Sequence, residues 1–115
     1  MENLTATNDQ FECIDLTDND IVKLEELPGL QRLETLMLAN NRVQKVDPAF
    51  GLLCPKLTNI VLTNNRIGKL QDIDAIASGC PNLERLSLMG NLVVNLPLYR
   101  LYTIFKLRNL KVLDF

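Results

Sequence analysis

Apolar residues recur along the chain in a short pattern that appears several times. The segment LETLMLANNRV at residues 33–43 is nearly repeated as LTNIVLTNNRI at residues 57–67. The same pattern fits FECIDLTDNDI from Phe11, LERLSLMGNLV from Leu83 and the shorter LKVLDF from Leu110. The five units start at intervals of 22, 24, 26 and 27 residues. Self-similarity at such a period is typical of a stacked repeat architecture.

Each unit fits L-x-x-L-x-L-x-x-N-x-L, which is the leucine-rich repeat pattern. The apolar positions of x-L-x-L-x alternate with period two, which predicts a short strand buried on one face. One strand and one turn of chain per unit give parallel strands in a solenoid. The predicted inward residues are Ile14, Leu16, Leu36, Leu38, Ile60, Leu62, Leu86 and Leu88.

The pattern therefore predicts an α/β fold, a leucine-rich repeat solenoid or horseshoe. A parallel sheet should line its concave side, helical or irregular segments its convex side, and a helix should cap its C-terminal end. Residues 1–115 would form a single domain of about four full repeats plus a partial C-terminal cap repeat.

An asparagine follows each predicted strand at the same place in the pattern. A carboxamide can both donate and accept hydrogen bonds, so it can satisfy backbone groups that a turn leaves unpaired. We expect a structural asparagine ladder rather than a ligand site. Its members are Asn19, Asn41, Asn65 and Asn91.

The segments that return between strands carry further apolar residues. Leu53 is expected to point inward, and residues 72–78 are expected to form a helical turn that ends at Ser78-Gly79. The stretch YRLYTIFKL is amphipathic at helical spacing and predicts the cap helix. Its apolar positions, expected to pack as a cap rather than to bind a ligand, are Tyr99, Tyr102, Ile104, Phe105 and Leu107.

Side chains that alternate with the buried leucines should project from the concave sheet. Small or flexible apolar residues would occupy its centre and charged residues its border, as expected of a surface that holds a helix of a partner protein. One outward column is predicted to run through Met37 and Val61 to Ser87 and Asp114. The centre is made by Met37, Ala39, Val61 and Met89, and Asp15, Asp18 and Arg85 lie around it.

Cations follow the ladder asparagines and should lie along one edge of the horseshoe. Four of them, Arg42, Lys45, Arg66 and Lys69, could meet phosphates there, although a solvated rim would have the same composition. The net charge of −2 argues against a protein that binds nucleic acid by electrostatics alone. Residues 1–34 hold nine acids and two bases, whereas residues 35–115 hold five acids and ten bases. Such polarity could orient a partner of mixed charge.

Several classes of protein are disfavoured by what the sequence lacks. There is no histidine, so triads that depend on histidine are unavailable. No glycine-rich phosphate loop or metal-ligand spacing appears, so we expect no enzyme activity, no cofactor, no metal and no small-molecule substrate. No apolar run is long enough to cross a bilayer. The three cysteines, Cys13, Cys54 and Cys80, are widely spaced and are expected to be buried thiols in a reducing compartment.

Two longer stretches carry a more specific resemblance. The opening NDQFECIDLTDNDIVKLEELPGLQRLETLMLANNRV, together with LTNIVLTNNRI and the close YRLYTIFKLRNLKVLDF, resembles the A-prime family of the U2 small nuclear ribonucleoprotein. The resemblance covers about residues 2–115. It implies a nuclear, non-catalytic protein of the spliceosome that acts in pre-mRNA splicing.

The same resemblance implies particular partners. In that family the concave sheet clasps a helix of a B-double-prime protein, which carries an RNA-recognition motif (RRM), and the pair binds a stem-loop of U2 small nuclear RNA. Carried over position by position, the resemblance implies helix contacts at Asp15, Asp18, Met37, Asn59, Val61, Thr63, Arg85 and Met89. Arg42, Arg66 and Lys69 would lie on the RNA side, and the RNA would be reached mainly through the partner. The alternative is a general intracellular leucine-rich repeat adaptor of the axonemal dynein-associated or acidic nuclear phosphoprotein type. The cap is similar in those proteins, but the acidic type carries a long acidic tail that is absent here.

Overall fold

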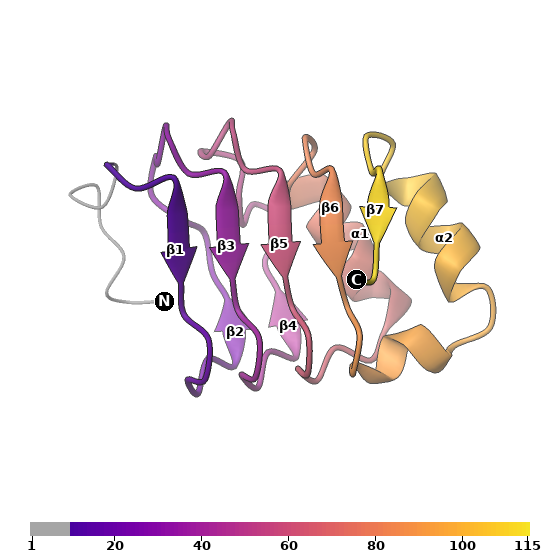
Figure 1. Ribbon diagram of the computed structural model, residues 1–115. Helices are drawn as coiled ribbons and strands as arrows, with labels where there is room; N and C mark the ends of the chain where they lie inside the picture. The colour runs from indigo at the N-terminus through magenta and orange to yellow at the C-terminus, as the bar shows by residue number, and fades with distance from the viewer. Residues whose placement is uncertain (1–9) are drawn as a thin grey trace.

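A computed structural model describes residues 10–115 and shows a row of parallel strands, one from each unit (Figure 1). The row is a five-stranded sheet in the order β1-β3-β5-β6-β7. Its strands are β1 Cys13–Asp15, β3 Thr35–Met37, β5 Asn59–Val61, β6 Arg85–Ser87 and β7 Val112–Leu113. Equivalent residues of successive units lie opposite one another, as the repeat requires. The fold class predicted from the pattern is confirmed.

The other side of the coils carries short strands and helices. β2 Lys23–Leu24 pairs in parallel with β4 Lys45–Val46 in a second, two-stranded sheet, which the sequence pattern did not predict. This sheet and α1 Leu70–Gly79 lie behind the main sheet (Figure 1). The 3₁₀ turn η2 Leu92–Asn95 and helix α2 Tyr99–Lys106 follow at the C-terminal end.

Helix α1 is longer than the predicted turn at residues 72–78. It starts at Leu70, two residues before the predicted start, and ends at Gly79, so the predicted stop at Ser78-Gly79 is confirmed. Gly79, its last residue, packs closely against the preceding coil. A Cβ atom there would lie 2.9 Å from the backbone nitrogen of Phe50, a contact that side chains do not tolerate.

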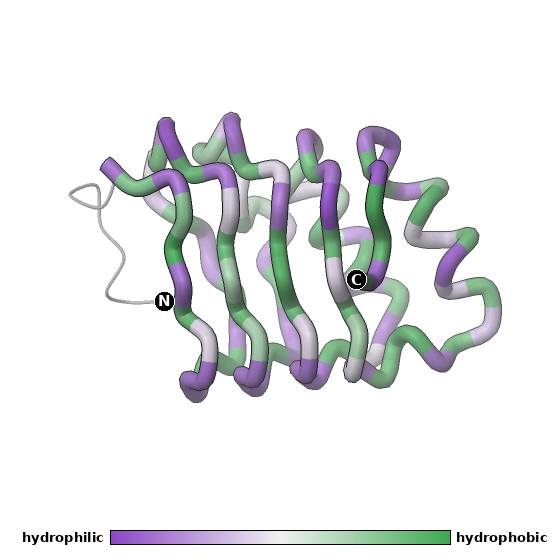
Figure 2. Tube along the Cα trace, in the orientation of Figure 1, coloured by the Kyte–Doolittle hydropathy of each residue, from purple (hydrophilic) through white to green (hydrophobic). Residues whose placement is uncertain are grey.

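The core lies between the main sheet and these return segments. Hydrophobic and hydrophilic positions alternate along the strands (Figure 2). The inward residues of β3, β5, β6 and the positions after them are all at most 1% exposed: Leu36, Leu38, Ile60, Leu62, Leu86 and Leu88. Each fully buried leucine or isoleucine contributes about 1.5–3 kcal/mol. Ile14 and Leu16 are only partly buried. The first described coil has a neighbour on one side within residues 10–115, so its leucines gain less cover.

The prediction for Leu53 is wrong. Its side chain is 48% exposed, and the buried residue of that turn is Cys54, at 3%. The chain makes successive tight turns over residues 48–56, and a turn does not keep the period that assigns faces in a strand.

Asparagine side chains join each coil to the one before it. Asn65 Nδ2 donates to the carbonyl of Leu38 in the preceding coil at 2.9 Å and to that of Leu62 in its own turn at 3.0 Å. Its Oδ1 accepts the backbone N–H of Val43, again in the preceding coil, at 2.9 Å. Equivalent bonds to both coils are made by two other asparagines, Asn41 and Asn91. Asn19 is exposed, and its printed bonds within the described chain are to its own turn.

Helix α2 closes the C-terminal end, but only part of its apolar stripe faces the coils. Tyr99 is buried and donates its hydroxyl to Asp114 Oδ2 at 3.0 Å. Burial, followed by the charge of Asp114, raises the pKa of Tyr99, so this hydroxyl stays protonated as a donor. Tyr102 donates to Asp74 of α1. The prediction fails for Ile104 and Phe105, which are 49% and 70% exposed, because they lie on the helix side that faces away from the coils.

Replacement of Asn65 by alanine is expected to lower the free energy of unfolding by about 1–3 kcal/mol. The change leaves the buried Val43 N–H without its acceptor, and an unpaired buried polar group carries that cost. The carbonyls of Leu38 and Leu62 each lose one donor but keep the bond from Asn41 or Asn91. Urea unfolding of parent and variant measures the difference. Asn19→Ala is the matched control and should cost less, because it breaks no bond to a second described coil. Equal stability of Asn65→Ala and the parent would contradict the ladder's structural role.

Candidate interaction surface

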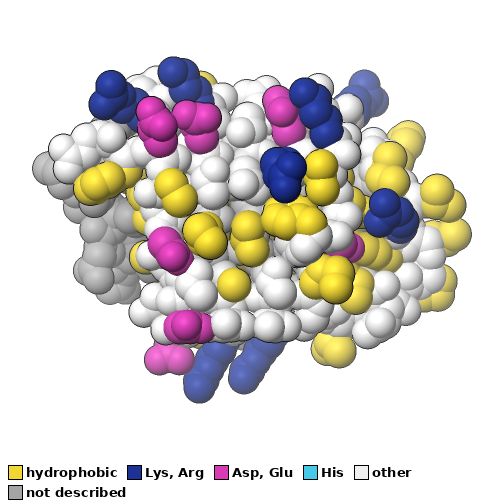
Figure 3. Space-filling view, in the orientation of Figure 1, with side chains coloured by type: hydrophobic (Ala, Val, Ile, Leu, Met, Phe, Trp, Pro, Cys, Tyr) yellow, Lys and Arg dark blue, Asp and Glu magenta, His cyan; other side chains and the backbone are white. Residues whose placement is uncertain are grey.

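The outer face of the main sheet is a continuous surface with an apolar centre. We call it the open face and define it by the outward residues of the sheet and the residues that adjoin them. These are Cys13, Asp15, Asp18, Thr35, Met37, Asn59, Val61, Thr63, Arg85, Met89, Val112 and Phe115. Hydrophobic side chains gather across its middle, and acidic ones lie toward the β1 end (Figure 3).

Strand register places the candidate contacts side by side. Asp15 lies opposite Met37, and Met37 lies opposite Val61. In the next column Asn59 lies opposite Arg85. Met37, Asn59, Val61 and Thr63 are half-buried, whereas Asp15, Arg85 and Met89 are exposed. Half-burial of apolar side chains on an uncovered sheet leaves area that a partner can bury further.

Two residues of the predicted outward column are not available there. Ser87 is fully buried, and its hydroxyl lies 3.0 Å from Thr63 Oγ1 and 3.3 Å from the Phe115 carbonyl oxygen. Asp114 accepts the backbone N–H of Leu88 through Oδ1 at 2.7 Å. Its φ of 60° turns the chain out of the strand geometry, so the alternation of faces fails at that point.

The same turn brings Phe115 onto the open face, where the sequence pattern did not place it. The Phe115 ring is 49% exposed, and the Arg85 guanidinium carbon lies 4.8 Å from the ring centroid. A cation over an aromatic face is held by the ring quadrupole. Arg85 is therefore positioned beside an apolar surface. No periodic signal could reveal this contact, because it depends on the left-handed backbone of Asp114.

A second polar ladder borders the open face where the chain leaves the strands. Asn40 Nδ2 donates to Asp18 Oδ1 at 2.8 Å, and Asn64 Nδ2 donates to Asn40 Oδ1 at 3.0 Å. Asp18, Asn40, Asn64 and Gly90 all have a positive φ, between 57° and 79°. A Cβ atom on Gly90 would lie 2.1 Å from Asn64 Oδ1, so glycine is required at that end. Asp18 is thus held at the rim with one oxygen already engaged.

Charge is distributed unevenly over the open face. Asp15 and Asp18 lie at its β1 end, whereas Arg85 lies on β6. The nearby Thr17 hydroxyl and a 2.9 Å hydrogen bond from the Thr17 backbone N–H lower the pKa of Asp15. Asp15 is therefore ionised at neutral pH. A bound segment would meet negative charge at one end of the sheet and positive charge toward the other.

The cations assigned to an RNA edge do not share one environment. Arg42 pairs with Asp20 at 3.6 Å, and both side chains are well exposed. Arg66 and Lys69 are exposed and line a groove on another side of the coils, away from the open face.

No group of three or more potential metal-ligating side chains occurs among residues 10–115. Within the same range, no helix combines the length and the apolarity that crossing a bilayer requires. Of the three cysteines, Cys54 and Cys80 are buried, but Cys13 is exposed on β1, so the expectation of three buried thiols is wrong. Cys13 alternates with the inward Ile14 and so lies on the outer side of its strand.

Comparisons with known proteins agree with this architecture. The family model described as leucine-rich repeat matches residues 1–115. The U2 small nuclear ribonucleoprotein A' of Arabidopsis thaliana is 53% identical over the whole chain, which covers 46% of that protein. The human protein of the same name is 45% identical over the whole chain, which covers 45% of it. The chain thus spans about half the length of the curated relatives it matches.

A solved structure extends the comparison. A chain of the Drosophila melanogaster SNF/U2A' complex superposes with a TM-score of 0.93 at 43% identity. The match covers all of the present chain and 66% of that chain.

A repeated coil with parallel strands, an internal asparagine ladder and an uncovered sheet defines a leucine-rich repeat protein with a surface for interaction. The chain belongs to the leucine-rich repeat family and, within it, to the U2 small nuclear ribonucleoprotein A' proteins. The resemblance seen in the sequence is confirmed.

Thiol labelling should distinguish the open face from the core. Burial, followed by the neighbouring Cys54, raises the pKa of Cys80 to about 12, so that its reactive thiolate is scarce at pH 8. A disulfide reagent at pH 8 should therefore modify one thiol, Cys13, rapidly in the folded chain, and all three after unfolding. Mass spectrometry of the labelled peptides identifies the site. Rapid modification of Cys54 or Cys80 in the folded chain would contradict the packing described here.

Proposed function

We propose that the chain is a non-catalytic scaffold of the U2 small nuclear ribonucleoprotein, acting in pre-mRNA splicing in the nucleus. Its open face binds a helix of an RRM protein of the B-double-prime type. U2 small nuclear RNA is reached mainly through that partner, with Arg42, Arg66 and Lys69 on the RNA side. Relatives over the full chain are named A' components of this particle, which supports the proposal.

The observation that carries the proposal is the uncovered apolar centre of a rigid sheet. Met37, Val61 and Met89 lie on successive strands or just beyond them, and Met89 is 50% exposed. Methionine packs adaptably against apolar partners, and a cylinder of about 10–12 Å diameter is the shape of a helix with side chains. A helix lying across the strands would cover these residues together. A structural relative was solved as a SNF/U2A' complex, which fits such a use of the sheet.

The charged residues of the open face differ in sign between its two ends. Asp15 and Asp18 would face basic side chains of the bound helix and Arg85 an acidic one, so charge complementarity favours one orientation of that helix. Asn59 Oδ1 has no hydrogen-bond partner among the described residues. A buried acceptor without a partner is costly, and a donor from the helix could satisfy it after a small rotation of the amide.

Met37→Glu is expected to abolish binding of the RRM partner while leaving the fold intact. The new carboxylate would lie beside Asp15 in the centre of the contact, where a like charge that must be desolvated costs several kcal/mol. Isothermal titration calorimetry should show at least a roughly 100-fold loss, since each 1.4 kcal/mol is about tenfold. Circular dichroism and thermal unfolding check that the half-buried site tolerates the change.

Two matched variants separate loss of contact from general damage. Met37→Leu keeps an apolar side chain at the site and should bind within a few-fold of the parent. Leu52→Glu places the same new charge on the convex side, where Leu52 is 53% exposed, and should bind as the parent does. Unchanged affinity of Met37→Glu would count decisively against the open face as the binding surface.

Copurification of the untagged chain from nuclear extract tests the assignment to the particle. An RRM protein recovered together with U2 RNA supports the proposed function. Recovery of axonemal dynein chains without U2 RNA would instead favour the general adaptor.

A further inference from the structure

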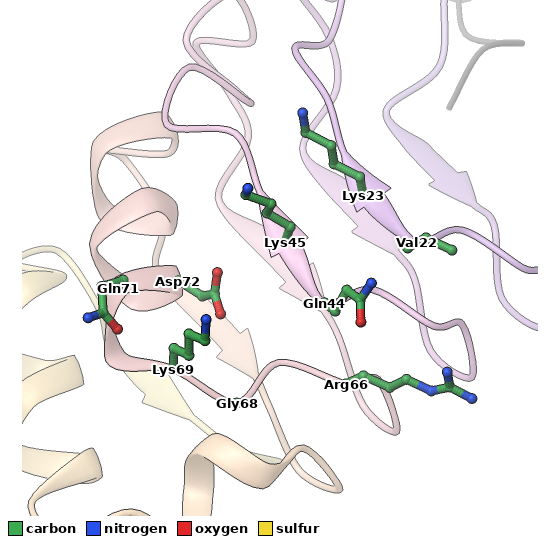
Figure 4. Close-up of a pocket in the computed structure, with 9 residues that line it drawn as sticks. All are labelled: Val22, Lys23, Gln44, Lys45, Arg66, Gly68, Lys69, Gln71 and Asp72. Carbon is green, nitrogen blue, oxygen red and sulfur yellow. The ribbon is translucent and has the colours of Figure 1, made fainter.

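A groove on another side of the coils is lined by four cations. It has a volume of about 760 Å³ and lies beside β2, β4 and the start of α1 (Figure 4). Lys23 and Lys45 come from the two strands, Lys69 and Arg66 from the next coil. Since β2 and β4 form a separate sheet behind the main one, this surface is distinct from the open face.

The lysines form a column that follows the repeat. Lys23, Lys45 and Lys69 each come twelve residues after the first residue of their units, Phe11, Leu33 and Leu57. Lys23 lies directly opposite Lys45 in the parallel pair β2–β4. Neighbouring strands are about 4.8 Å apart, and like charges directly opposite one another are destabilising. The stacking of Lys23 on Lys45 therefore does not stabilise the fold.

Compensating charge in the groove is scarce. Asp72 is its single acidic residue, and none of the four cations forms an ion pair within 4.0 Å with any carboxylate in residues 10–115. Burial raises the pKa of Asp72, while a backbone hydrogen bond and the charges of Lys69 and Lys45 act in the opposite direction. With one acid against four cations, the groove is positive whether or not Asp72 is ionised. Arg42, by contrast, is paired with Asp20 and does not line it.

The other lining residues indicate what kind of anion fits. Val22 is the one apolar side chain that lines the groove, apart from the stems of the lysines, and no aromatic residue does. Bases of a single strand would find nothing to stack on, and side chains of an acidic peptide would find no pocket. Lysine ammonium groups are compact, hydrated point charges that suit phosphate oxygens. Their regular spacing suits a polymer of such charges.

We propose that this groove binds the phosphate backbone of double-helical RNA directly and independently of sequence. The proposal rests on the proposed ribonucleoprotein role for the presence of RNA, but it does not require the partner on the open face. It adds Lys23, which the edge pattern left out, to Lys45, Arg66 and Lys69. Phosphate contacts of this kind position RNA and add affinity without reading its bases.

Fluorescence anisotropy of the full chain with two RNA hairpins of unrelated stem sequence, over a series of salt concentrations, tests the contact. Lys23→Gln, Lys45→Gln and Lys69→Gln are combined in one variant. Each phosphate contact contributes about 0.9 to the slope of log affinity against log salt. The triple variant should therefore bind both hairpins more weakly and lose about 3 from that slope. The parent should bind the two hairpins equally.

The matched control removes the same charge elsewhere. Arg32→Gln, Lys56→Gln and Arg108→Gln are combined at three exposed positions outside the groove. This variant should keep most of the parent's slope. Equal slopes for the two triple variants would overturn the proposal. Poly-glutamate that binds as tightly as the hairpins at equal salt would also overturn it, because the groove would then take acidic protein.

The same assay separates this contact from the proposed function. Met37→Glu should retain the parent's affinity and salt slope for the hairpins, since the open face does not take part in this contact. If the groove variant changes nothing while Met37→Glu still abolishes partner binding, the groove proposal fails and the proposed function stands. If Met37→Glu lost RNA binding by the chain alone, the separation of the two surfaces would be wrong.

Discussion

The asparagine ladder is the interaction on which the rest of the structure depends. The strands of the main sheet are only two or three residues long, too short to hold neighbouring coils in register by themselves. Asn41, Asn65 and Asn91 each bond the turn of their own coil and two backbone groups of the coil before it. These bonds set the position of one coil on the next, so the leucines meet between coils and the outward residues line up in columns.

That alignment gives the chain two surfaces with different chemistry. Because register is the same at every step, an outward position repeated in each unit becomes a column across the molecule. On the main sheet the columns give an apolar centre with Asp15 at one end and Arg85 toward the other. On the second sheet they give stacked lysines. The same repeat therefore builds both surfaces: the proposed protein-binding face and the proposed RNA-backbone groove.

The sequence was sufficient for the parts of the fold that follow its period. Leucine spacing predicted the strands and their parallel order, and Met37 and Val61 lie in one column because alternation holds within β3 and β5. Prediction from the sequence failed where the backbone geometry departs from the repeat period. The positive φ of Asp114 brings Phe115 beside Arg85. The sequence pattern placed Lys45, Arg66 and Lys69 along one edge but left out Lys23. Its position beside Lys45 depends on the pairing of β2 with β4, two-residue strands that carry almost no signal.

Methyl NMR of the methionines most directly tests the claim that the aligned coils present the open face to a protein partner. The chain has three methionines, of which Met37 and Met89 lie on that face. In a chain labelled with ¹³C at the methionine and isoleucine methyl groups and titrated with the RRM partner, the signals of Met37 and Met89 should shift or broaden together. The methyl signals of the buried Ile73 and Ile76 of α1 should stay in place. A bound complex in which both methionine signals stay unchanged would contradict the account.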